Sequence, residues 1–88
     1  MWYVYVLLSK PAEKTYVGYT SDPERRLFEH NVSEMKGFTL RYRPWQIIYT
    51  ETFATKEEAM KREKFLKTGQ GREEVRRIVE NYHGRERE

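Results

Sequence analysis

A glutamate on the inward side of a predicted helix is the charged residue that most needs a chemical explanation. The apolar stripe of this helix is formed by Ala59, Met60 and Leu66. Glu63 lies on or beside that stripe. Burying an unpaired carboxylate costs free energy, so Glu63 needs a cation, a hydrogen-bond network or a watery cleft. The simpler alternative is a salt bridge to Arg26 or to a neighbouring lysine, because buried charges are usually paired.

Two basic side chains and two tyrosines in the first third of the chain are also candidates for chemistry. Arg26 and His30 are four residues apart, so they share one flank of a predicted helix. Tyr5 and Tyr16 lie on two predicted strands. Taken alone, strand tyrosines usually serve packing, and a single histidine of this kind is usually a satisfied surface residue.

Gly18 follows Tyr16 on the same face of its predicted strand. A glycine within a strand marks a bend or a place where another group approaches the backbone closely. That group is either a nucleic-acid phosphate or, in the simpler interpretation, part of a bulge or of tight packing against the following helix.

Cations alternate with aromatic rings in residues 32–44, which have no clean periodicity and are predicted to form a loop with a short helical turn. The residues concerned are Lys36, Phe38, Arg41, Tyr42 and Arg43. A second group of cations comprises Lys61, Arg62, Lys64 and Lys67. Cations beside aromatic faces suit phosphates and exposed bases, so we prefer substrate contact to a solvated connector. The net charge of +3 alone decides nothing, because 35% of the residues are charged and both signs are present.

Hydrophobic patterning and capping signals predict the element order β-β-α-β-α-α, which is an α+β fold. The expected strands are Trp2–Leu8, Thr15–Tyr19 and Trp45–Thr52. The first helix should begin at Asp22 as its N-cap with Pro23 in the first position. The second should open with a capping box of Thr55 and Glu58, run to about Thr68, and stop at a left-handed Gly69. The last helix is expected from about Arg72 to Tyr82.

The first strand is almost continuously apolar, which predicts a central place in the sheet with burial on both faces. Side chains alternate along a strand. One face should therefore carry Trp2, Val4, Val6 and Leu8, and the other Tyr3, Tyr5 and Leu7.

A chain of 88 residues allows one domain with a modest core. It contains no cysteine, which excludes disulfides and thiolate metal sites. We find no N-terminal targeting pattern and no run near the roughly 20 apolar residues of a membrane span. We therefore expect a soluble, cytoplasmic protein with one domain over residues 1–82 and a flexible polar tail over residues 83–88.

Several of these residues together resemble the signature of the GIY-YIG nuclease family. Its two triplets correspond to Tyr3–Tyr5 and Tyr16–Gly18. Arg26 follows the glycine by eight positions, and His30 stands where the family carries Tyr or His. The first triplet begins with tyrosine in place of glycine, at a position that varies in the family. The resemblance covers about Trp2 to Lys67 and is closest to small stand-alone members, related to the N-terminal nuclease domain of the DNA-repair excinuclease C subunit.

This resemblance implies a three-stranded antiparallel sheet flanked by helices, and an endonuclease that hydrolyses DNA with one divalent metal, Mg²⁺ or Mn²⁺. By similarity, Glu63 binds the metal and Arg26 holds the scissile phosphate. Tyr5 and Tyr16 position and deprotonate the water; we favour Tyr5 as the base, with His30 as a helper and Tyr16 as a competitor. Some relatives carry a lysine just after the second triplet, where this chain has Tyr19.

Further nucleic-acid contacts are expected at Gly18, Tyr19, Lys36, Arg41 and Arg43. Flexible or branched DNA is the favoured substrate, and the sequence does not distinguish between DNA and RNA as the nucleic acid bound. One alternative is a nucleic-acid-binding module of the same fold with little or no turnover. Another is a protein-interaction adaptor that docks through the mixed-charge face of the last helix.

Overall fold

The computed structural model describes residues 1–33 and 38–86. Its elements in chain order are β1 (Trp2–Ser9), β2 (Lys14–Thr20), α1 (Pro23–Phe28), the π-helical turn η1 (Glu29–Ser33), α2 (Phe38–Arg41), β3 (Gln46–Phe53), α3 (Lys56–Leu66) and α4 (Gly69–Glu86). The predicted α+β class is confirmed, with the short elements η1 and α2 added between α1 and β3. Within the described residues, no helix combines the length and the apolarity that crossing a bilayer requires.

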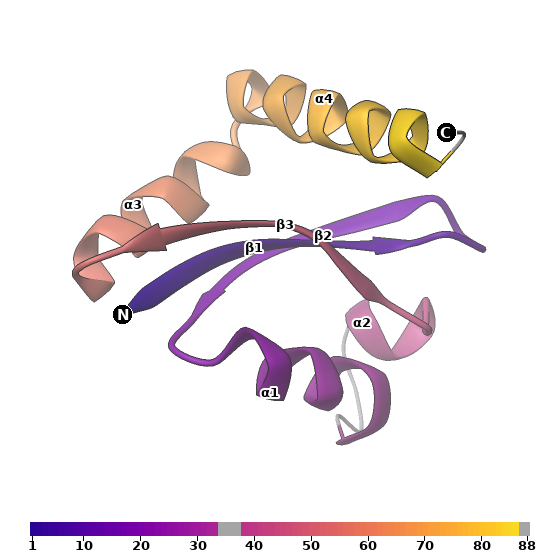
Figure 1. Cartoon of the computed structure of the whole chain (residues 1–88), viewed down its shortest axis with the longest axis horizontal. Coiled ribbons are helices and arrows are strands. Elements are labelled where there is room, and N and C mark those ends of the chain that lie inside the picture. Colours follow the sequence, from indigo (N-terminus) through magenta and orange to yellow (C-terminus); the bar gives the residue numbers. More distant parts are fainter. Residues whose placement is uncertain (34–37, 87–88) are drawn as a thin grey trace.

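The three strands form one antiparallel sheet in the order β2-β1-β3, so β1 is central as predicted. Helices α3 and α4 cover one face of the sheet, and α1 and α2 lie against the other (Figure 1). In the pairing of β1 with β2, Tyr5 stands opposite Gly18 and Leu7 opposite Tyr16. Because β2 pairs only with β1, its outer side is one rim of the sheet.

The alternation predicted for β1 separates two apolar cores. Val4, Val6 and Leu8 pack beneath α3 and α4 with Ala59, Leu66 and Val75. On the other face, Tyr5 and Leu7 pack with Trp45. Tyr5, Tyr16 and His30 therefore lie on the side of the smaller, aromatic core. The larger aliphatic core packs against the opposite face of the sheet and supports them from there.

Local capping explains where two of the helices begin. Asp22 is the N-cap of α1, and its carboxylate accepts from the backbone N–H of Arg25 at 3.1 Å. Thr55 and Glu58 form the predicted capping box at the start of α3, each accepting from the backbone N–H of the other at 3.2 Å. Both predictions are confirmed. Polar side chains at these positions satisfy the unpaired N–H groups of the first helical turn.

The junction between α3 and α4 differs from the prediction. Gly69 is the first residue of α4 rather than a left-handed stop after α3. The hydroxyl of Thr68 accepts from the N–H of Gly71 at 3.2 Å and so caps the new helix. A Cβ on Gly71 would lie 1.9 Å from the carbonyl oxygen of Phe65, so only glycine lets the two helices meet this closely.

Helix α4 also extends beyond the predicted end at Tyr82 and continues to Glu86. Glu86 pairs with Lys10 of the β1–β2 connection and accepts a 3.3 Å hydrogen bond from the hydroxyl of Tyr82. This pairing anchors a stretch that the sequence predicted to be a flexible tail from His83. Residues 87 and 88 lie outside the described part of the chain.

An ion-pair network joins the helices to the rim strand β3. Arg62 of α3 binds Glu51 of β3, with Nε 2.9 Å from Oε1, and also binds Glu74 of α4. Tyr49 donates its hydroxyl to the same Glu51 carboxylate. Hydrogen bonds from Arg62 are the main reason that the pKa of Glu51 and the pKa of Glu74 lie below their usual value. Burial, followed by the Glu51 bond, raises the pKa of Tyr49.

Candidate active site

A buried chain of polar contacts links Tyr5, His30 and Thr39. The hydroxyl of Tyr5 lies 3.0 Å from Nε2 of His30, and Nδ1 of His30 lies 2.9 Å from Oγ1 of Thr39. A ring nitrogen that carries a proton donates and one that does not accepts, so the direction of each of these two bonds depends on the tautomer of His30. His30 is only 1% exposed, and the surface position considered for it is wrong.

Tyr16 is packed against this chain and is its more accessible phenol. Its ring centroid lies 4.8 Å from that of His30 and 6.3 Å from that of Tyr5. Tyr16 is half-buried, whereas Tyr5 is 1% exposed. Of the two tyrosines that the sequence offered as a base, Tyr16 is therefore the one that solvent reaches more readily.

Gly18 makes the position of Tyr5 possible. The two residues are paired across β1 and β2, and a Cβ on Gly18 would lie 2.4 Å from the hydroxyl oxygen of Tyr5. The group that approaches the glycine backbone is therefore a phenol of the protein itself, neither the following helix nor a bulge. Gly18 is buried below it.

Glu63 forms an ion pair with the lysine one turn further along α3. Its Oε2 lies 2.8 Å from Nζ of Lys67, and the two side chains are 16% and 49% exposed respectively. Nζ of Lys67 also lies 5.7 Å from the centroid of the Tyr16 ring. The neighbouring lysine considered from the sequence is thus the partner of Glu63, and it connects the carboxylate to Tyr16.

Arg26 does not pair with Glu63. Its Nη1 lies 2.7 Å from Oε1 of Glu29, three residues later, and its side chain is 29% exposed. Arg26 lies in α1 close to its junction with η1, the turn that carries His30. The arginine and the histidine therefore come from adjoining helical turns on the same side of the sheet.

The predicted nucleic-acid contacts are dispersed. Tyr19 packs against Trp2 on the opposite face of the sheet, with ring centroids 6.2 Å apart. Arg43 is half-buried and donates from Nε to the carbonyl oxygen of His30 at 2.6 Å, while Arg41 is exposed on α2. Lys36 lies outside the described residues. Of this group, Arg43 is thus bonded directly to the backbone of the His30 turn.

Several residues that support the site were missed from the sequence. Asn31 holds both backbone groups of Trp45, accepting from its N–H at 2.6 Å and donating to its carbonyl at 2.9 Å. The indole N–H of Trp45 in turn donates to the carbonyl of Thr39 at 2.6 Å. The first contact joins residues 14 positions apart and the second joins residues 6 positions apart, so no local sequence pattern predicts them. The pairing of Lys67 with Glu63 could have been predicted from the sequence, because side chains at positions i and i+4 are neighbours on a helix.

The donor set suits a metal held by one carboxylate. Among residues 1–33 and 38–86, no group of three or more His, Cys, Asp or Glu side chains is placed to hold an ion. Glu63 offers hard oxygen ligands of the kind that Mg²⁺ prefers, an ion that usually keeps several waters. Its present partner is the half-exposed ammonium of Lys67, on a flexible stem that can turn away into solvent. A divalent cation therefore fits at Glu63 if water and a phosphate complete its shell.

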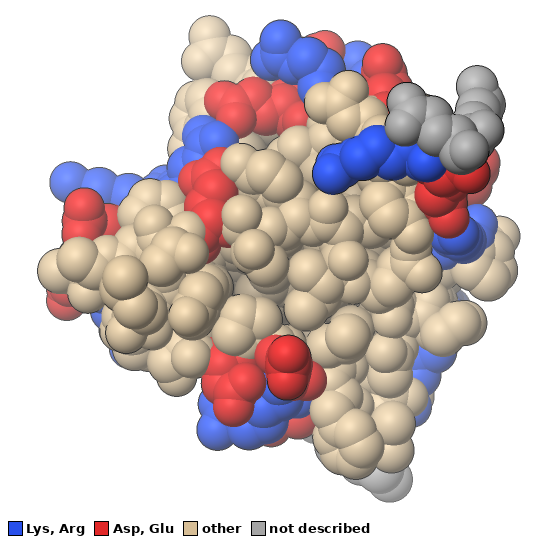
Figure 2. Space-filling view, in the orientation of Figure 1, with Lys and Arg blue, Asp and Glu red and all other residues tan. Residues whose placement is uncertain are grey.

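On the face of the molecule shown in Figure 2, charge does not gather into a field of one sign. Figure 2 shows Lys and Arg side chains next to Asp and Glu side chains over the helices, with a broad uncharged area between these groups. This mixture agrees with the small net charge of +3. Any attraction for a polyanion must therefore come from local groups of cations rather than from the whole molecule.

Comparison with known proteins assigns the family. The GIY-YIG catalytic domain matches residues 1–76. A UPF0213 protein of Staphylococcus saprophyticus is 37% identical over 89% of this chain and 94% of its own length. A UPF0213 protein of Natronomonas pharaonis is 42% identical over 75% of this chain and 76% of its own.

A solved structure agrees in fold. The solution NMR structure of a UPF0213 protein from Bacillus halodurans superposes with a TM-score of 0.51 at 30% identity, and the match covers 89% of this chain and 85% of that one. The UPF0213 names state no activity, whereas GIY-YIG domains are in general nuclease domains that act on nucleic acid. With its two triplets on β1 and β2 and the matched residues 1–76, the chain belongs to the GIY-YIG catalytic domain family.

Proposed function

We propose that this protein is a divalent-metal-dependent endonuclease that hydrolyses phosphodiester bonds in DNA. The observation that supports this most is the convergence of side chains distant in sequence. Tyr5, His30 and Thr39 are bonded in series, and Tyr16 packs on His30. Lys67 then links Tyr16 to the carboxylate of Glu63. A purely structural role for the tyrosines would not require a carboxylate connected to Tyr16 through Lys67.

Hydrolysis forms a bond from a water oxygen to phosphorus and breaks the bond from phosphorus to the 3′ oxygen. The water must lose a proton, and charge develops on the phosphate oxygens and on the leaving oxygen. We assign the first task to the Tyr16 oxygen, in its deprotonated form, because Tyr16 is more accessible than Tyr5. The ammonium of Lys67 lies 5.7 Å from the centroid of the Tyr16 ring, and the proton taken from the water later returns to solvent.

The remaining roles follow from position and charge. The guanidinium of Arg26 binds the non-bridging oxygens of the scissile phosphate, exchanging its bond to Glu29 for the phosphate. His30 and Tyr5 fix the ring of Tyr16 from the buried side. Glu63 would hold Mg²⁺ or Mn²⁺, which would supply positive charge to offset the charge that develops on the leaving oxygen.

Cleavage assays test this proposal directly. Purified protein is incubated with single-stranded, nicked and branched DNA, with Mg²⁺ or Mn²⁺ and with a chelator, and products are resolved on denaturing gels. We expect metal-dependent cleavage that Arg26→Ala and Glu63→Gln abolish without unfolding the protein. Arg77→Ala and Glu80→Gln, exposed on α4, are the matched controls and should cleave as the parent does. Absence of cleavage of all three substrates with either metal would contradict the proposal.

The second candidate is a nucleic-acid-binding module with little turnover. The ion pair of Glu63 with Lys67 favours it, because that carboxylate already has a cationic partner. This candidate predicts salt-dependent DNA binding that Arg41→Ala and Arg43→Ala weaken, with no product formed under any metal. Metal-dependent product from the parent protein, absent in Glu63→Gln, excludes it.

A further inference from the structure

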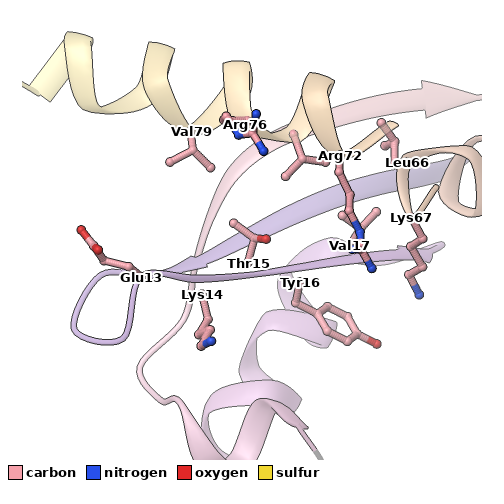
Figure 3. A pocket seen from close by; sticks show the side chains of 11 residues that line it. Glu13, Lys14, Thr15, Tyr16, Val17, Leu66, Lys67, Arg72, Arg76 and Val79 are labelled. Atoms are coloured by element: carbon pink, nitrogen blue, oxygen red, sulfur yellow. The ribbon is translucent and has the colours of Figure 1, made fainter. Parts of the chain in front are cut away.

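A pocket of about 740 Å³ lies along the free edge of β2, where this strand faces the end of α3 and the first half of α4. Figure 3 shows the strand on one side and α4 on the other, with Arg72 and Lys67 reaching from the helices to the level of β2. We call this pocket the β2-edge groove. Its lining includes Lys14, Tyr16, Lys67, Arg72, Arg76 and Val79.

The groove is continuous with the candidate active site. Tyr16 and Lys67 both line it, Lys67 lies 5.7 Å from the Tyr16 ring centroid, and Lys67 also forms the ion pair with Glu63. Lys14, two residues before Tyr16, extends from the same side of β2 in Figure 3. A linear ligand bound at Tyr16 can therefore continue along the edge of the strand towards Lys14.

Cations outnumber acids in the lining. Four of its residues are Lys or Arg, and Glu13 is the acidic one among the described lining residues. Lys67 and Arg76 are partly neutralised by Glu63 and Glu73. Arg72 and Lys14 form no ion pair within residues 1–33 and 38–86, and Lys14 stands 5.8 Å from the ring centroid of Tyr42. Positive charge is thus available both from α4, through Arg72, and from the edge strand β2, through Lys14.

The floor of the groove is rigid and apolar. Val17, Leu66 and Val75 are buried members of the large core beneath α3 and α4, and Val79 packs against them. A floor that belongs to the core keeps its shape when a ligand binds, which lowers the entropic cost of binding. Aliphatic side chains there can contact sugar carbons but offer no donors or acceptors for reading base edges.

We propose that the β2-edge groove holds the sugar-phosphate backbone of one DNA strand beside the bond that is cleaved, with Arg72 and Lys14 as its phosphate contacts. This inference rests on the proposed function, because the occupant is the substrate of that site. A peptide pairing with the free edge of β2 is the competing occupant. The excess of cations in the lining, with Arg72 and Lys14 outside the ion pairs of the described residues, favours a polyanion, and binding there is independent of base sequence.

Fluorescence anisotropy with a labelled single-stranded oligonucleotide, in chelator to prevent cleavage, tests the groove. Affinity is measured across salt from about 50 to 300 mM for the parent and for Arg72→Ala, Lys14→Ala and Arg77→Ala. Arg77→Ala is the matched control, because it removes the same charge from an exposed site on α4 outside the groove. We expect roughly three- to ten-fold weaker binding for each groove variant, and a salt slope smaller by about 0.7 per lost cation.

The outcomes separate the groove from the nuclease. If Arg72→Ala and Lys14→Ala bind like the parent, or Arg77→Ala weakens binding equally, the groove is not the path of the strand, even if the parent cleaves DNA. If both groove variants bind more weakly and the parent cleaves nothing, the groove is supported and the hydrolytic proposal fails. Parent protein that does not bind the oligonucleotide at low salt overturns the groove.

Discussion

A methyl group on Gly18 would lie 2.4 Å from the hydroxyl oxygen of Tyr5 and 2.6 Å from the ring carbon that carries it. Both distances are far below van der Waals contact, and Tyr5 is too buried to swing aside. The lack of a side chain at Gly18, in the second triplet, therefore leaves the space that the ring of Tyr5, in the first triplet, occupies. Their pairing across β1 and β2 explains why the two triplets occur together.

Gly18→Ala should consequently displace the phenol of Tyr5 and break its 3.0 Å bond to His30. We expect a loss of roughly 1–3 kcal/mol in the free energy of unfolding, as is usual for overpacking a tight core. Any cleavage activity should fall at the same time. Denaturant unfolding followed by circular dichroism measures the first effect, and gel assays measure the second.

Gly84→Ala is the matched control, because nothing lies within 4 Å of the added Cβ and the residue is helical. This change should be neutral or stabilising by up to about 1 kcal/mol, since alanine favours a helix over glycine. Equal stability of Gly18→Ala and Gly84→Ala would refute the role given to Gly18.

Thr39 is expected to act through His30 rather than on substrate. Thr39→Val keeps the shape of the side chain but removes the oxygen that lies 2.9 Å from Nδ1 of His30. We expect a loss of about 1–2 kcal/mol in stability and a reduction of cleavage by roughly ten- to a hundred-fold, because the imidazole loses its orientation. The pH profile of cleavage should also change shape in this variant. Thr52→Val, on the exposed part of β3, is the control and should leave both quantities unchanged.

The ion pair of Glu63 with Lys67 should compete with a metal for the same carboxylate. Lys67→Met removes the competing ammonium, so Mn²⁺ should bind about two- to five-fold more tightly, which corresponds to the usual worth of such a pair. Titration of free Mn²⁺ by electron paramagnetic resonance measures this affinity without any substrate. Lys64→Met, exposed on α3, should have no comparable effect, and Glu63→Gln should abolish binding. Weaker Mn²⁺ binding in Lys67→Met would contradict the competition.

The Arg62 network should make stability depend on pH at both ends of the range. Glu51 and Glu74 have lowered pKa values in the folded protein, so their contribution is complete above pH 4.5 and is lost as the pH falls through those lowered values. Tyr49 has a raised pKa, so its contribution is complete below pH 10 and is lost as the pH rises through the raised value.

Arg62→Met should remove most of the acid dependence and cost roughly 1–3 kcal/mol at neutral pH, a value between those of exposed and buried ion pairs. Chemical denaturation at several pH values measures both changes. Arg76→Met, whose partner Glu73 is largely exposed, should cost no more than about 0.5 kcal/mol. An unchanged acid limb in Arg62→Met would show that other carboxylates govern this range.

Local signals in the sequence predicted most of the fold. The alternation of Trp2 to Leu8, the Asp22 cap and the Thr55 capping box each depend on neighbours within a few residues, and all three are confirmed. Gly69 was misassigned because a glycine near a helix end was taken as a stop, whereas Thr68 caps the next helix here. The end of α4 depends on Lys10, 76 residues away from Glu86, which no local pattern reveals.

The residues of the candidate site were easier to propose from the sequence than their geometry. The resemblance to the GIY-YIG motif singled out Tyr5, Tyr16 and His30, which the structure brings into contact. Burial was not predictable, because it depends on how η1 and α2 fold over the sheet, and a surface position was therefore the simpler alternative considered for His30. Thr39 and Asn31 belong to contacts that exist only after the chain has folded.

The place of β2 at the rim of the sheet bears on whether a DNA substrate needs a free end. Tyr16 lies on an outermost strand, so a chain can be laid sideways across it while both of its ends run on into solvent. No terminus has to be threaded into a tunnel. A covalently closed circle of single-stranded DNA should therefore be opened as readily as a linear molecule of the same length.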